Sequence, residues 1–302
     1  MSSSAELFTI GLAISAIIIF WGLSSTSSSP FARSFPRLYN KRICLLIAHP
    51  DDEAMFFSPT VLSLTRPELG NHLKILCLSN GDADGLGSVR AKELQKSAKK
   101  LGLRSESDVF VVDDPSRFPD SMTANWTESD VSNMLAYAFA PELASATLKK
   151  KSTKDGPPVS TIDVLLTFDK HGISNHPNHR SLYHGAVHFL RSLMRDKAGY
   201  TCPVSLYTLS TTTIFRKYIG IFDAPLTMLR GALHTLFLGS GKGKGKKDEL
   251  PDQLLFINSV SEYLTAQSAM VNAHKSQMVW FRYGWITIGR YMVVNDLRRQ
   301  WV

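Results

Sequence analysis

Cysteine is scarce in this sequence, and the spacings that would give it a structural role are missing. The 302 residues contain three cysteines, Cys44, Cys77 and Cys202, and none belongs to a CxxC pair. An odd number of isolated cysteines argues against a disulfide framework and against a thiolate metal site. We therefore expect the chain in a reducing environment.

Charge is also limited, and acidic residues are the fewer. Charged residues make up 20% and hydrophobic residues 44% of the chain, which excludes a disordered chain and a multi-span membrane protein. The 26 acidic residues face 34 basic ones, a net charge of +8. This excess favours an anionic partner but does not by itself distinguish nucleic acid, phosphate and a lipid surface.

Basic residues are missing before the one long apolar run. Residues 7–23 are 17 uncharged, mostly apolar residues, at the short end of the ~17–25 needed to span a bilayer. The flank over 24–42 carries basic residues and no acid. We expect residues 1–24 to form a single transmembrane anchor and 25–41 a basic linker, with the remainder on the cytosolic side. A cleaved signal is the alternative, although such a signal usually begins with basic residues.

Short β-rich runs alternate with helical patterns from residue 42 onward. The predicted strands are 43–48, 73–78, 109–112, 162–168 and 204–209, and the clearest predicted helices are 88–101, 128–148 and 179–194. The strands are almost continuously apolar, as parallel strands buried on both faces are. The pattern predicts an α/β, Rossmann-like, doubly wound and mostly parallel sheet with helices on both faces. Its ligand crevice should lie at the carboxyl ends of the strands.

Residues 211–250 interrupt this alternation within a single catalytic domain over 42–302. The segment 211–240 is apolar and weakly basic, and it is compatible with an in-plane membrane contact or with helices packed into the core. The lysines and glycines of 241–247 predict a mobile basic loop. The tail from Gln277 is aromatic and basic, which suits a membrane interface and ordinary packing equally well.

Residues 48–53, of sequence AHPDDE, directly follow the first predicted strand. His49 and Asp52 lie three residues apart around a proline and can bind one cation through nitrogen and oxygen. Asp51 between them is free to accept a proton from water. A helix N-terminus rich in acids is the alternative interpretation of the same residues.

A second group of histidines follows the strand predicted at 162–168. His176 and His179 flank a proline and asparagine at the start of a helix, close enough for one to bind metal while the other faces the substrate. Two histidines and a carboxylate, with a fourth position for water, are typical of a hydrolytic zinc centre. His274, like His72 and His234, stands alone and is interpreted as a packing or surface residue.

A glycine-rich loop over 80–87 follows the second predicted strand and precedes Arg90. Free backbone N–H groups there could hold an anion, and Arg90 could hold a phosphate or a sugar hydroxyl. A purely structural turn fits this loop as well.

Four segments together resemble the PIG-L deacetylase family: 48–53, 79–94, 167–183 and 276–285. Within it, the surroundings of His176 and the Trp-Phe-Arg of the tail resemble the eukaryotic branch that acts in GPI-anchor synthesis. The resemblance implies metal binding by His49, Asp52 and His179, with Asp51 as the general base.

The same resemblance implies roles for further residues. His176 would assist, in its protonated form, as acid or oxyanion stabiliser, and Arg90 and Asp120 would lie on the substrate-binding side. Asn178 departs from the HPDH form of bacterial relatives, which puts a supporting carboxylate at this position in doubt.

The implied activity is hydrolysis of the N-acetyl group of N-acetylglucosaminyl-phosphatidylinositol, with Zn²⁺ or another divalent cation as cofactor. The implied location is the endoplasmic reticulum membrane, with the catalytic domain facing the cytosol. Partners would be the glycolipid and the membrane, and no nucleic acid. Deacetylation of a soluble N-acetylglucosaminyl conjugate and a catalytically silent, membrane-tethered glycolipid-binding module are the alternatives.

Overall fold

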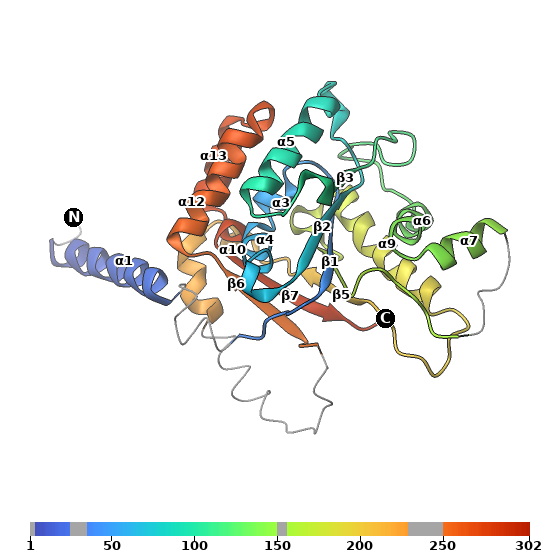
Figure 1. The fold of residues 1–302 in the computed structure, drawn as a ribbon. Coiled ribbons are helices and arrows are strands. Elements are labelled where there is room, and N and C mark those ends of the chain that lie inside the picture. The colour runs from blue at the N-terminus through green and yellow to red at the C-terminus, as the bar shows by residue number, and fades with distance from the viewer. Residues whose placement is uncertain (1–3, 25–34, 150–155, 229–249) are drawn as a thin grey trace.

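The computed structural model describes residues 4–24, 35–149, 156–228 and 250–302 (Figure 1). These residues contain a seven-stranded sheet of order β3-β2-β1-β4-β5-β7-β6. Its strands are β1 (Arg42–Ile47), β2 (His72–Cys77), β3 (Val109–Val111), β4 (Val164–Phe168), β5 (Ser205–Leu209), β6 (Gln253–Ile257) and β7 (Val294–Gln300).

The helices surround this sheet. They are α1 (Ser4–Ser24), α3 (Asp52–Met55), α4 (Ser58–Leu64), α5 (Gly87–Lys100), α6 (Glu128–Phe139), α7 (Pro141–Lys149), α8 (Gly172–Asn175), α9 (Pro177–Leu193), α10 (Ile214–Lys217), α12 (Val260–Ser268) and α13 (Trp280–Ile288). Short 3-10 or π turns are η1 (Pro67–Leu69), η2 (Asp82–Asp84), η3 (Glu106–Asp108), η4 (Gly220–Phe222), η5 (Ala269–Ala273), η6 (Lys275–Gln277) and η7 (Arg290–Met292).

The predicted doubly wound core is confirmed by five parallel strands. β3, β2, β1, β4 and β5 pair in parallel along this order, and each coincides with a predicted strand. α4 and α5 lie on one face of the sheet and α6 and α9 on the other (Figure 1). This arrangement brings the chain segments that follow β1 and β4 to the same edge of the sheet.

The sheet is mostly parallel, as predicted, but the sequence did not predict the strands at the C-terminal end of the chain. β7 runs antiparallel between β5 and β6, so the sheet is mixed. β7 has the sequence VNDLRRQ and exposes part of its length. Strands buried on both faces have continuous apolar sequences, whereas a partly exposed strand such as β7 does not.

The helix predicted over 128–148 is two helices. α6 ends at Phe139 and α7 begins at Pro141, because proline lacks an N–H and pushes the residue before it out of the helical region. Ala140 accordingly has φ −137° and ψ 69°. α6 packs closely on α9, since a Cβ on Gly185 would lie 2.2 Å from the Cβ of Val131.

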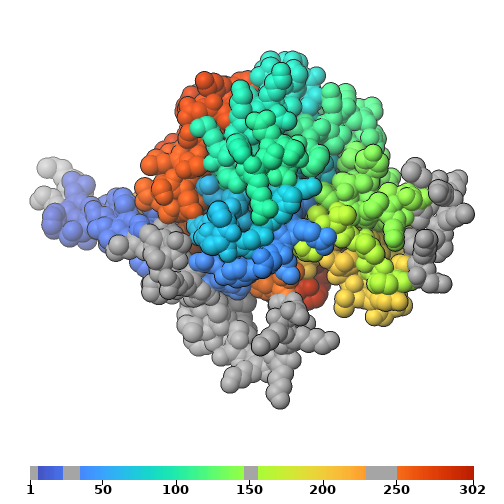
Figure 2. All heavy atoms as spheres, in the orientation of Figure 1, coloured from blue at the N-terminus to red at the C-terminus, as the bar shows by residue number. Residues whose placement is uncertain are grey.

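The N-terminal apolar run forms helix α1, but the transmembrane prediction is not confirmed. Among the residues described here, none of the helices combines the length and the apolar character that a membrane crossing requires. Most of α1 stands away from the body (Figure 2), whereas its last turn is packed: Trp21 is buried and its indole N–H donates to the Asn258 carbonyl at 2.9 Å.

Two predicted connecting segments are partly described. Phe35 and Leu38, at the end of the predicted linker, are buried in the core, because both side chains are apolar. Within 211–250 the described part forms α10, η4 and a helical stretch over 223–228, which buries Ala224 and Met228. The predicted basic loop over 241–247 lies outside the described residues.

Candidate active site

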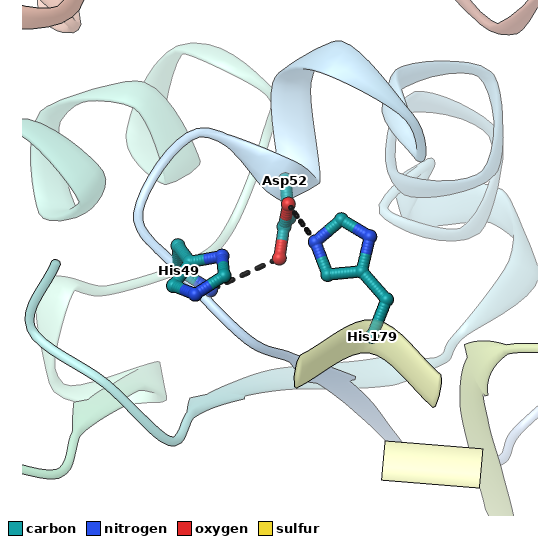
Figure 3. A group of neighbouring side chains, drawn as sticks. All are labelled: His49, Asp52 and His179. Carbon is teal, nitrogen blue, oxygen red and sulfur yellow. Dashed lines mark hydrogen bonds and ion pairs between the residues drawn. The ribbon is translucent and has the colours of Figure 1, made fainter. Parts of the chain in front are cut away.

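The turn after β1 presents Asp52 in a fixed orientation. Its Oδ2 accepts hydrogen bonds from the backbone N–H groups of Ala48 and His49, at 2.9 and 3.0 Å. These two bonds hold the carboxylate at the start of α3 with Oδ1 directed across the site. Oδ1 lies 3.2 Å from Nε2 of His179 (Figure 3).

His179 comes from the first turn of α9 and is held on three sides. Its ring stacks on Phe168 with a centroid distance of 4.0 Å, and its Nδ1 donates to the carbonyl of Gly172 at 3.2 Å. Gly172 has φ +58°, and a Cβ there would lie 2.9 Å from the Cβ of His179. The hydrogen bond on Nδ1 leaves Nε2 as the nitrogen available to a metal.

His49 completes the group from the end of β1. Its Nε2 lies 3.0 Å from Oδ1 of Asn178 and 3.3 Å from Oδ1 of Asp120. The ligand atoms that His49, Asp52 and His179 can offer all lie within 4.8 Å of one another. Neighbouring ligand atoms around a tetrahedral zinc ion are about 3.3 Å apart, so the 3.2 Å between Asp52 and His179 suits such an ion.

A second, overlapping triad shares His49 with the first. Ligand atoms of His49, Asp120 and His176 also lie within 4.8 Å of one another. Asp120 and His176 are only half-buried, whereas Asp52 and His179 are buried. The geometry therefore favours the first triad as the site of a tightly held ion.

The ionisation of these groups follows from burial and from their mutual distances. Burial alone would raise the pKa of Asp52, but the charge and hydrogen bond of His179 outweigh it and hold this pKa well below its usual range. Burial lowers the pKa of His49. Burial alone would lower the pKa of His179, but the charge of Asp52 outweighs it and raises this pKa. A metal ion bound here would therefore displace the proton of that ring.

Asp51 is buried next to this triad in an unusual backbone conformation. Its φ of 119° lies in the left-handed region, which is uncommon outside glycine. Burial raises the pKa of the Asp51 carboxyl to about 7, with Arg282 opposing the shift. The guanidinium of Arg282 pairs with Oδ2 of Asp51.

His176 lies beside both histidines of the first triad. Its ring is 5.0 Å from that of His49 and 4.7 Å from that of His179, centroid to centroid. Burial, together with these two rings, lowers the pKa of His176 to about 4. The crowding of three imidazoles in one desolvated site therefore favours a neutral His176 over the protonated form that we expected.

Arg90 and Asp120 line the same edge of the sheet. Nη1 of Arg90 donates to the carbonyl of Gly81 at 2.7 Å and lies 3.6 Å from Oδ2 of Asp120. Nη2 of Arg90 binds Asp84 at 2.9 Å. Asp120 thus links Arg90 to His49, so the two residues predicted on the substrate side do lie next to the triad.

Sequence patterns did not indicate several residues that contact the site. Asn178 is fully buried and uses its amide oxygen on His49 and on the N–H of Ser121, so an amide fills the place of the supporting carboxylate. Arg282 pairs with Asp51, and His274, interpreted as a packing residue, is buried against Glu53 at 2.7 Å. The Trp-Phe-Arg tail motif was the one available signal for Arg282.

Comparisons with known proteins show the family of this chain. The sequence profile described as "GlcNAc-PI de-N-acetylase" (PIG-L) matches residues 44–190. The chain is 55% identical, in an alignment 340 positions long that covers 100% of both chains, to N-acetylglucosaminyl-phosphatidylinositol de-N-acetylase of Arthroderma benhamiae. The chain belongs to the GlcNAc-PI de-N-acetylase family.

Two further similarities extend the comparison. A probable de-N-acetylase of the same name from Schizosaccharomyces pombe is 35% identical over 288 residues, which cover 95% of this chain and 96% of the relative. Among solved structures, N,N'-diacetylchitobiose deacetylase of Pyrococcus horikoshii aligns with a TM-score of 0.40 at 15% identity, covering 99% of this chain and 94% of that one. The family assignment depends on the sequence relatives and not on this structural likeness.

Proposed function

We propose that this chain hydrolyses the N-acetyl group of N-acetylglucosaminyl-phosphatidylinositol, giving glucosaminyl-phosphatidylinositol and acetate. The observation that carries the proposal is the meeting of His49, Asp52 and His179, from two distant segments, beside a buried Asp51. The named relatives supply the substrate class, because one of them matches this chain along its full length.

We propose Zn²⁺ as the cofactor, held by Asp52, His179 and His49. Two imidazoles and one carboxylate in this arrangement suit zinc, although they also accept other divalent ions. When bound, the ion would supply Lewis acidity at the substrate carbonyl and lower the pKa of water. Side chains of the protein itself would transfer the proton and stabilise the oxyanion.

Asp51 is proposed as the general base. Its carboxylate lies next to the triad, and a pKa near 7 leaves a substantial ionised fraction at neutral pH while keeping the group basic enough to accept a proton. The attacking water gives its proton to Asp51 as its oxygen bonds to the acetyl carbon. The carbon–nitrogen bond then breaks as Asp51 returns this proton to the nitrogen, and the acetic acid formed beside the free amine ionises to acetate.

His176 is proposed to stabilise the oxyanion as a neutral N–H donor. The backbone N–H of Asn178 donates to Nδ1 of His176 at 3.2 Å, which places the proton of the neutral ring on Nε2. A neutral imidazole can stabilise a developing negative charge through this N–H. Arg90 and Asp120 are proposed to contact the sugar or phosphate of the headgroup.

We also propose that the enzyme works at the endoplasmic reticulum membrane with its catalytic domain toward the cytosol. The lipid nature of the proposed substrate and the free state of all three cysteines support this location. Protease treatment of intact microsomes tests it: the catalytic domain should be digested without detergent, and protection until detergent is added would place it in the lumen.

Deacetylation of the glycolipid by the purified protein tests the proposed activity. We expect wild-type protein to release acetate and Asp51→Asn to lose on the order of 10³-fold in kcat while retaining its metal. Wild-type-like turnover by Asp51→Asn would remove Asp51 from the mechanism. Equal activity on water-soluble N-acetylglucosaminyl-inositol would favour a soluble conjugate as the substrate.

A further inference from the structure

Asp51 is held at both its backbone and its side chain by separate residues. Its backbone N–H donates to Oε2 of Glu53 at 3.1 Å, and its carboxylate pairs with Arg282. A left-handed conformation at a residue other than glycine is unfavourable and persists only where its surroundings enforce it. Glu53 and Arg282 therefore both bear on where the Asp51 carboxylate points.

Glu53 is in turn held by the C-terminal part of the chain. It is fully buried, and its Oε1 lies 2.7 Å from Nε2 of His274 and also accepts from the hydroxyl of Ser97. The other ring nitrogen of His274, Nδ1, lies 2.9 Å from Nε2 of Gln277. His274 therefore connects Glu53 to Gln277.

Gln277 completes the connection to Arg282. Its Oε1 accepts from Nη1 of Arg282 at 3.2 Å. Since a guanidinium only donates, the Gln277 oxygen faces Arg282 and its NH₂ donates to His274. His274 accordingly donates from Nε2 to Glu53, and every hydrogen bond in the series has a donor and an acceptor.

These bonds form a closed ring that starts at the backbone nitrogen of Asp51 and returns to its carboxylate. The ring passes through Glu53, His274, Gln277 and Arg282. The last three residues lie outside 44–190, the range matched by the family profile. The segment that carries them is fixed at each end, by Ser276 on Glu93 at 2.6 Å and by the Trp285 indole N–H on the Met55 carbonyl at 3.0 Å.

We propose that this ring positions Asp51 for catalysis, with Glu53, His274, Gln277 and Arg282 as its positioning residues. The inference rests on the proposed role of Asp51 as the base in deacetylation. A base displaced by about 1 Å from its productive geometry costs on the order of 10²-fold in rate. The ring limits such displacement because it constrains the backbone and the carboxylate of the same residue together.

A purely structural role predicts different measurements. Loss of a merely stabilising contact lowers the melting temperature and the folded fraction but leaves kcat per folded molecule unchanged. Loss of positioning lowers kcat while KM stays the same, since substrate binding does not depend on where Asp51 points. The two roles are therefore separable in one set of variants.

The test compares Gln277→Leu, Arg282→Gln and Arg282→Lys with wild type in the full-length protein. Gln277→Leu opens the ring at a residue that does not touch Asp51. Arg66→Gln is the matched control, because Arg66 pairs with Glu262 at 2.6 Å and is about as buried as Arg282, at 20% and 21% side-chain exposure. For each variant kcat, KM, bound zinc and melting temperature are measured with the glycolipid.

We expect kcat to fall about 10- to 100-fold in Gln277→Leu and Arg282→Gln, with KM and bound zinc as in wild type. Arg282→Lys should recover part of the loss, because it restores a cation beside Asp51. The control should match wild type in kcat.

Several results would overturn the proposal. Wild-type kcat in Gln277→Leu and Arg282→Gln would show that the ring is only structural, and a raised KM at unchanged kcat would assign Arg282 to substrate binding. In both cases wild-type turnover and its loss in Asp51→Asn would leave the proposed function intact. A wild-type protein without deacetylase activity would refute both proposals. If Arg282→Gln does not fold, Arg282→Lys and Gln277→Leu decide the question.

Discussion

Two buried charge clusters of this molecule are built differently. Around Asp223, which is fully buried, every carboxylate oxygen is in use: Oδ1 accepts from Arg216 at 2.7 Å, and Oδ2 accepts from Arg216, Thr227 and Arg290. Arg290 also donates to Asp296 at 2.9 Å. Among the described residues, the charges in this cluster are matched by partners within the protein.

The cluster at the carboxyl edge of the sheet leaves ligand atoms facing one another. Asp52 uses Oδ2 on backbone N–H groups, while its Oδ1 and Nε2 of His179 face each other across the site. Asp51 beside them adopts a left-handed backbone conformation. The difference indicates that the Asp223 cluster stabilises the fold, whereas the Asp52 cluster presents oxygen and nitrogen atoms that can bind a cation.

The largest expected effect is at the Asp52 cluster. Asp52→Asn keeps an acceptor for the backbone N–H groups but removes the charge that a cation needs. We expect activity to fall by well over the 10- to 100-fold typical of losing a residue that merely supports a ligand, together with loss of bound zinc. Metal analysis and the deacetylation assay measure this, and full zinc content in the variant would contradict it.

Asp223→Asn should lower the stability of the protein and leave its activity unchanged. Removing this charge takes one of its two carboxylate partners from the buried Arg290, which costs about 3–5 kcal/mol in free energy of unfolding. Activity per folded molecule should be unchanged. Urea unfolding followed by tryptophan fluorescence measures the loss, with Asp296→Asn as a milder control. A loss below about 1 kcal/mol would remove the contrast between the clusters.

Low pH should reduce the stability that the Asp223 cluster contributes. Burial alone would raise the pKa of Asp223, but its hydrogen bond from Arg216 and the charge of Arg290 hold this pKa below its usual value. A carboxyl with a depressed pKa contributes stability that is complete above its unfolded pKa of about 3.9 and is lost as pH falls through the folded value. The stability difference between wild type and Asp223→Asn should therefore be constant from pH 7 to about 5 and shrink below about pH 4. An unchanged difference in acid would contradict it.

The smallest effect is expected at an exposed pair. Arg42 binds Asp163 with a 2.6 Å contact, but its side chain is 55% exposed. Solvent screening limits such a pair to about 0–1 kcal/mol. Arg42→Gln should thus leave activity unchanged and barely move the urea midpoint. A loss of stability as large as that of Asp223→Asn would show that burial does not explain the difference between the exposed pair and the Asp223 cluster.

Much of the fold was predictable because it follows from local pattern. The five parallel strands read as apolar runs, and the motif at 48–53 falls at the end of the first of them, so the position of His49 and Asp52 at the sheet edge was expected. β7 was not, because an antiparallel strand with Asp296, Arg298 and Arg299 has no continuous apolar run. The transmembrane prediction for residues 1–24 depended on the apolar run over 7–23 and on the charges that flank it, and the described helices do not confirm it.

The sequence predicted the residues of the candidate metal triad, which the structure brings together, but it did not predict the residues that support them. Two histidines and an aspartate carry their chemistry in their residue types and in their places after strands. His274 and Gln277 carry no such signal, since a single histidine more than 200 residues from Glu53 is indistinguishable in sequence from a packing residue. Their role depends on η5 and η6 folding against α3 and α5.

The amino-acid sequence alone determined the parallel core, the residue types of the metal site and the family to which they point, because hydrophobic periodicity and short motifs are local properties. Only the tertiary structure decided that three imidazoles crowd one desolvated site, that Asn178 supports His49, and that Arg282 reaches Asp51. Each of these depends on distances and desolvation between segments far apart in the chain, and the sequence does not encode such distances in any local pattern.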